Sequence, residues 1–93
     1  MRTSPDLPLT VVELEYRMRL TPEEFYILTE ECRTRLEPYS PKLHVTADGF
    51  VLTMHCAAGI TAARDHAPRM ALPVLHVEPV TVQCTATTPS PNG

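Results

Sequence analysis

The chain has no tryptophan, and aromatic residues make up only 5% of its 93 residues. Proteins that bind single-stranded nucleic acid commonly stack bases on aromatic side chains, so this scarcity weighs against such a role. A basic excess is also missing, because the formal net charge is −3. Together these deficits argue against a protein whose main task is to coat nucleic acid.

Paired cysteines and long apolar runs are missing as well. The three cysteines, Cys32, Cys56 and Cys84, have no regular spacing and do not form a disulfide framework, so we expect reduced thiols. No window approaches the roughly 20 apolar residues that span a bilayer, and the N-terminal residues lack the pattern of a signal peptide. We therefore expect a soluble cytoplasmic protein, in the host cytoplasm if it is viral, with no membrane partner.

Glycine occurs three times, too rarely for a glycine-rich phosphate loop, whereas proline occurs ten times and divides the chain into segments. Residues 1–8 contain two prolines and no periodicity. We predict a flexible arm over residues 1–8, a single domain over 9–84 and a disordered tail over 85–93.

Apolar and polar residues alternate from Leu9 to Leu20, which is typical of a strand in a sheet with one solvated face. "TPEE" follows, in which Thr21 and Glu24 can form a capping box and Pro22 suits the first helical position. We predict a helix over residues 22–37, ended by Pro38, with its buried face formed by Phe25, Leu28, Cys32 and Leu36.

Residues 42–56 predict a β-hairpin, because Asp48-Gly49 is a preferred pair for a two-residue type I′ turn. In the predicted register Ala47 faces Phe50, and apolar residues then share one face of the hairpin. Beyond Gly59 the pattern weakens. We expect a short helix over residues 60–66, interrupted by Pro68, and an edge strand over 74–84 with a bulge at Pro79.

The predicted order of elements is strand, helix, strand, strand, short or irregular helix, strand. This order predicts an α+β protein with the small ferredoxin-like (βαββαβ) antiparallel sheet, with the first and third strands central and the helices on one face. The alternative is a strand–helix–hairpin core with an irregular C-terminal half.

The other face of such a sheet is open, and we expect it to carry a charged row from the first strand together with histidines, including His76 of the last strand. A row of this kind is either the solvated side of a sheet or a recognition surface. We favour a non-catalytic protein-binding module, such as a small inhibitor or adaptor encoded by a phage or mobile element. The edge strand and the open face also allow a homodimer. The predicted binding residues are Glu13, Glu15, Arg17, Arg19, His44 and His55.

The same residues suggest two other classes of function. A nucleic-acid-binding ferredoxin-like domain is the main alternative, although Tyr16 and Phe50 fall on the inward side of their strands, and nucleic acid is therefore an unfavoured partner. A metal site is the other, because His44 and His55 are diagonal neighbours in the predicted register. The histidine and cysteine spacings match no zinc pattern, so we expect no metal and no cofactor.

"ELEYR", at residues 13–17, resembles the Glu-x-Glu-x-Lys start of the CYTH and triphosphate tunnel families, with Arg17 in the lysine position. The resemblance implies acidic residues that hold a metal and a basic residue that meets a phosphate chain. It ends with these few residues, since the later basic motifs of the tunnel are missing. We therefore predict that the protein is not an enzyme.

Overall fold

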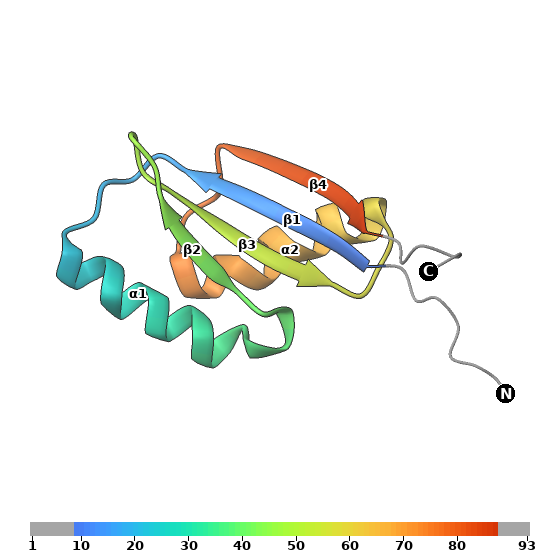
Figure 1. Ribbon diagram of the computed structural model, residues 1–93, viewed down its shortest axis with the longest axis horizontal. Coiled ribbons are helices and arrows are strands. Elements are labelled where there is room, and N and C mark those ends of the chain that lie inside the picture. The colour runs from blue at the N-terminus through green and yellow to red at the C-terminus, as the bar shows by residue number, and fades with distance from the viewer. Residues whose placement is uncertain (1–8, 88–93) are drawn as a thin grey trace, which may run out of the picture.

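The computed structural model describes residues 9–87 (Figure 1). The arm expected over residues 1–8 and the last part of the expected tail, residues 88–93, lie outside the described residues. The elements in chain order are β1 (Leu9–Tyr16), α1 (Pro22–Arg35), the short 3-10 helix η1 (Glu37–Tyr39), β2 (Lys42–Val45), β3 (Phe50–Cys56), α2 (Ile60–Leu75) and β4 (Thr81–Thr87).

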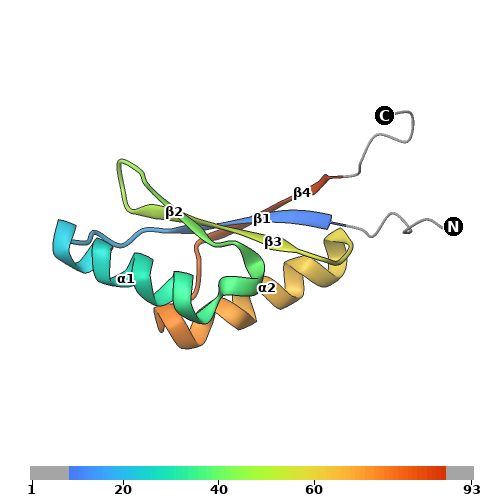
Figure 2. The same cartoon turned by 60° about the horizontal axis from the view of Figure 1, so that its bottom comes forward.

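The four strands form one antiparallel sheet in the order β2-β3-β1-β4, and both helices cover the same face of it (Figure 2). The α+β prediction with β1 and β3 as central strands is confirmed. Helix α1 packs against β2 and α2, whereas α2 lies under β4, β1 and β3. Within residues 9–87 neither helix has the length and apolar character needed to cross a membrane.

The core lies between the sheet and the helices, and its centre is the inward face of β1 and β3. Tyr16 and Phe50 stack there with ring centroids 5.1 Å apart. Cys32 is buried, as the helical pattern predicted, and so is Cys56. The remaining fully buried residues of the two central strands are Thr10, Val12, Leu14, Leu52 and Met54.

β1 ends at Tyr16, four residues earlier than the alternation predicted. The chain leaving β1 passes directly over the β2–β3 loop, where a Cβ on Gly49 would collide with the carbonyl oxygen of Tyr16 and lie 2.8 Å from the nitrogen of Met18. Because the chain crosses the loop here, the residues after Tyr16 do not continue the strand. Alternating exposure continues through Leu20 nonetheless, which explains why the sequence pattern does not show where the strand ends.

The start of α1 follows the prediction closely. The Thr21 hydroxyl accepts a hydrogen bond from the Glu24 backbone N–H at 3.1 Å, and the Glu24 carboxylate accepts one from the Thr21 N–H at 2.9 Å. Such a cap contributes about 1 kcal/mol. The helix ends at Arg35 with Leu36 as its C-cap, and Pro38 lies within η1 rather than ending α1 itself.

The hairpin exists, but its predicted register is wrong by two residues. Val45 pairs with Phe50, and the loop spans residues 46–49 instead of being a two-residue turn. Thr46 closes this loop, since its N–H donates to the Gly49 carbonyl at 2.8 Å and its hydroxyl accepts from the Gly49 N–H at 3.1 Å. A shift of two residues leaves every side chain on its predicted face, because side chains alternate with a period of two.

The prediction of a short or irregular second helix is wrong, since α2 is continuous over Ile60–Leu75 with Pro68 and Pro73 inside it. Each proline removes one backbone hydrogen bond, but Pro73 is exposed and Pro68 is only partly covered. The opposite face packs tightly on the sheet through a stripe of completely buried alanines. These are Ala63, Ala67 and Ala71.

The last strand also differs from its prediction. Val74 and Leu75 belong to the end of α2, and Pro79 lies in the connection before β4 instead of forming a bulge inside a strand. Residues 85–87, expected in a tail, are part of β4. The prediction of an edge strand is confirmed, because β4 lies at one end of the strand order and pairs with β1 alone within residues 9–87.

Candidate functional site

The sheet face opposite the helices carries Glu13 and Glu15, which are neighbours along β1. Glu13 lies between Thr53 of β3 and Gln83 of β4. Glu15 is partly buried, and its carboxylate accepts a hydrogen bond from the Thr81 hydroxyl at 2.8 Å. The two acidic residues therefore do lie on the open face, on an open sheet with two edges rather than inside a tunnel.

Arg17 and Arg19 are not on this face as strand residues, which corrects the idea of one continuous charged row. Both follow the end of β1 and are exposed. Arg19 instead borders a shallow hollow beside the β2–β3 loop, together with Leu20 and Val45. Arg17 and Arg19, the basic residues of the predicted row, therefore lie beside the sheet and not on its open face.

The histidines are separated as well. His44 is level with Val51 on β3, and His55 lies four residues further along that strand, which corresponds to about 13 Å. The predicted diagonal pair is therefore wrong. His76 is not in a strand either, because it caps the C-terminus of α2 in a left-handed conformation with φ 61°. No group of three or more metal-ligating side chains forms within residues 9–87.

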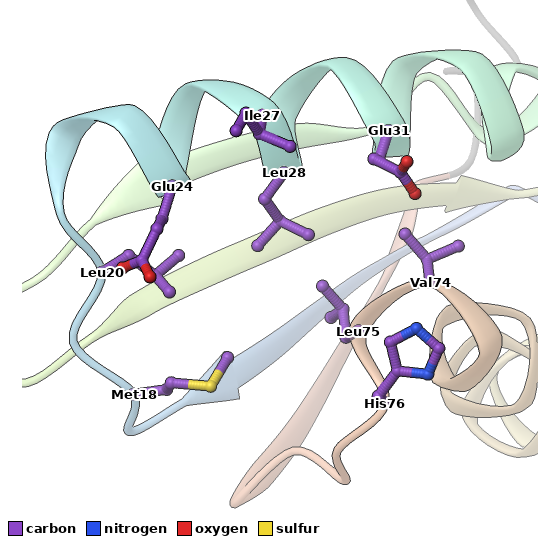
Figure 3. A pocket seen from close by; sticks show the side chains of 9 residues that line it. All are labelled: Met18, Leu20, Glu24, Ile27, Leu28, Glu31, Val74, Leu75 and His76. Atoms are coloured by element: carbon purple, nitrogen blue, oxygen red, sulfur yellow. The ribbon is translucent and has the colours of Figure 1, made fainter.

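The sequence did not predict the groove that lies between the two helices. Its volume is about 410 Å³, and Figure 3 shows Leu28 of α1 pointing toward the end of α2. The apolar lining comes from three separate segments: the chain after β1, α1 and the end of α2. It consists of Met18, Leu20, Ile27, Leu28, Val74 and Leu75, with Glu24, Glu31 and His76 as the polar residues.

The apolar surface continues outward from this groove along α1. Tyr26 and Ile27 are 65% and 56% exposed, and Ile27 borders both the groove and a second hollow of about 350 Å³. A signal for this surface was present in the sequence. Phe25, Leu28 and Cys32 account for the inward face of α1, so two large apolar residues on another face lacked a packing role.

The buried ionisable groups of the core are held in their neutral forms. Burial, together with the nearby Glu31 carboxylate, raises the pKa of the Cys32 thiol to about 11. Burial also raises the pKa of Tyr16, with smaller contributions from Cys32 and Glu78. The pKa of Cys56 is raised by burial and then by Cys84. At neutral pH these thiols are therefore poor nucleophiles.

Comparison with known proteins gave no match to a family model, a curated protein or a solved structure.

Proposed function

We propose that this chain is a non-catalytic protein-binding domain that acts as a small inhibitor or adaptor. The observation that carries the proposal is the exposure of Tyr26 and Ile27 beside the helix–helix groove. A contiguous apolar surface of this kind is typical of an interaction site, and aromatic and methionine side chains are enriched in protein interfaces. The groove adds a concave region into which a partner's side chain can insert.

The partner segment that we propose is apolar and also carries lysine or arginine. Leu28 and Leu75 offer apolar walls, which favour an aliphatic or aromatic side chain. Glu24 and Glu31 border the same groove and give it an acidic rim, although Glu31 lies 3.8 Å from Arg35 in an exposed pair. Exposed ion pairs contribute only about 0–1 kcal/mol, so the rim would select the partner more than it would strengthen binding.

We also propose the ferredoxin-like assignment for the fold. The support is the β-α-β-β-α-β order of elements, the central position of β1 and β3 and the placement of both helices on one face. In this arrangement the open sheet face is a second proposed surface for the same binding function. Its charged and titratable side chains are Glu13, Glu15, Lys42, His44 and His55.

The test is selection of a random peptide library on the immobilised full chain, followed by binding to matched variants. We expect enrichment of peptides that combine apolar and basic residues, and loss of their binding to Ile27→Asp. Ile60→Asp is the matched control, since Ile60 is 39% exposed at the start of α2, at the opposite end of that helix from the groove. Equal binding to wild type and to Ile27→Asp would refute the groove as the site.

Two further variants separate the groove from the sheet. If Glu13→Lys with Glu15→Lys abolishes binding and Ile27→Asp does not, the binding surface is the open sheet face. Arg17→Glu with Arg19→Glu tests the basic residues beside it. Binding of RNA or DNA that weakens steeply with salt would instead support the nucleic-acid alternative.

A further inference from the structure

Among the residues that the structure describes, none pairs with the outer edge of β4. Thr81–Thr87 bonds to β1 on one side, and no strand within residues 9–87 lies on its other side. Its sequence, TVQCTAT, contains no charged residue and no proline. An edge strand leaves every second set of backbone N–H and C=O groups unpaired, and these groups can bond to another strand.

The opposite edge of the sheet has the features that usually prevent such pairing. β2 has only four residues, follows Pro41 and carries Lys42 and His44 on the open face. Short edge strands, prolines and charged side chains are the common protections of an edge. β4 has seven residues and none of these protections within the strand. It is therefore the edge open to strand addition.

We propose that β4 pairs antiparallel with β4 of a second copy of this chain, which joins the two sheets across a twofold axis. An antiparallel strand is self-complementary under a twofold axis, and the resulting dimer is closed. Charge does not oppose a second copy within the seam itself. Each chain carries a net charge of −3, but no charged side chain of β4 would face its counterpart in this seam. The dimer is independent of the groove beside α1.

Full overlap of the two strands fixes the register. Cys84 is the midpoint of Thr81–Thr87, so it lies opposite Cys84 of the second copy, with Val82 opposite Ala86 and Gln83 opposite Thr85. Gln83 and Thr85 are exposed, whereas Val82 and Cys84 are partly buried and pack against the core. This register therefore matches polar with polar and apolar with apolar positions, which a slip of one residue would destroy.

The strength of the dimer follows from the size of the seam. A seven-residue strand is about 23 Å long and a sheet is about 10 Å deep, which gives roughly 230 Å² of projected area. Stable interfaces bury about 800 Å² per partner. The dimer is therefore weak and reversible, and it forms as the protein concentration rises.

Disulfide trapping in the full chain tests both the dimer and its register. With diamide as the oxidant, the two Cys84 sulfurs form an S–S bond, and two electrons and two protons pass to diamide, which becomes a hydrazine. We expect rapid formation of a covalent dimer by the wild-type chain and its loss in Cys84→Ser. The other two cysteines are buried and serve as internal controls.

The register is tested in the Cys84→Ser background with Gln83→Cys and Thr85→Cys. Each single variant places its two thiols on diagonal positions, about 7–8 Å apart at Cα, which is beyond the usual reach of a disulfide. A mixture of the two variants places Cys directly opposite Cys and should form a covalent dimer faster than either alone. Equal rates in the mixture and the single variants, or a monomer mass at every concentration in sedimentation equilibrium, would overturn the proposal.

Discussion

Replacing Tyr16 with phenylalanine should stabilise the protein. Tyr16 is 1% exposed, and its hydroxyl has no hydrogen-bond partner within the part of the chain that the structure describes. Its ring stacks on Phe50 with an interplanar angle of 20°. Phenylalanine keeps the ring and this stacking, and it removes only the buried hydroxyl.

The expected size of the effect comes from two opposing contributions. A buried polar group without a partner costs about 1–3 kcal/mol. Removing one oxygen leaves a very small cavity, for which the cost at about 24 cal/mol per Å³ is a few tenths of a kcal/mol. The free energy of unfolding should therefore rise by about 1–2 kcal/mol, which corresponds to several degrees in the melting temperature of a domain of this size.

Urea unfolding at neutral pH measures this change, provided that the slope m is the same in both proteins. Tyr39→Phe is the matched control, because the Tyr39 hydroxyl lies 2.9 Å from Nε2 of His66. That change should be neutral or destabilise by up to about 1 kcal/mol. A loss of stability above about 0.5 kcal/mol in Tyr16→Phe would refute the reasoning and would show that the Tyr16 hydroxyl makes a favourable hydrogen bond.

Three further predictions concern the core and the crossing over the hairpin. Gly49→Ala should destabilise by about 1–3 kcal/mol, because the new Cβ would collide with the Tyr16 carbonyl oxygen; in the same urea assay Gly59→Ser, with open space around it, should change stability by only a few tenths of a kcal/mol. Deprotonation linked to Cys32 should lower stability by about 2 kcal/mol as pH rises from 9 to 11, because burial raises the pKa of Cys32 from 9.0 to about 11 and the folded state holds its proton over that window; Cys32→Ala should reduce the slope but leave part of it, because burial also raises the pKa values of Tyr16 and Cys56, and an unchanged slope would contradict the assignment. Ala67→Leu should lower the free energy of unfolding by about 1–3 kcal/mol, because Ala67 is completely buried between α2 and the sheet. Retention of wild-type stability would show that the helix–sheet spacing can relax.

The features predictable from the sequence are those set by local periodicity. The capping box at Thr21 and Glu24 needs only residues three apart, and it forms as predicted. The inward side of β3 follows from a period of two, so it was correct even though the hairpin register was wrong by two residues. Turn chemistry was less reliable here, because Thr46 supplies side-chain and backbone hydrogen bonds that favour a longer loop over the Asp48-Gly49 turn.

The features that could not be predicted depend on packing between distant segments. A proline inside a helix costs about 3 kcal/mol of stability, so the sequence predicts that α2 is interrupted at Pro68. Burial of the alanine stripe, followed by Val74 and Leu75, holds the helix together through both prolines. Similarly, β1 stops at Tyr16 because the chain must cross Gly49, and no local pattern encodes that crossing.

Part of the groove follows from local periodicity, and part follows from packing between distant segments. A binding role fits α1 better than it fits the charged sheet face. The open face satisfies its own polar groups in part, as the bond between Thr81 and Glu15 shows. α1 contributes one fully buried residue, Cys32, while Tyr26 and Ile27 remain exposed. Apolar side chains that stay exposed on a helix add little to the stability of the fold. A partner's apolar segment would bury them.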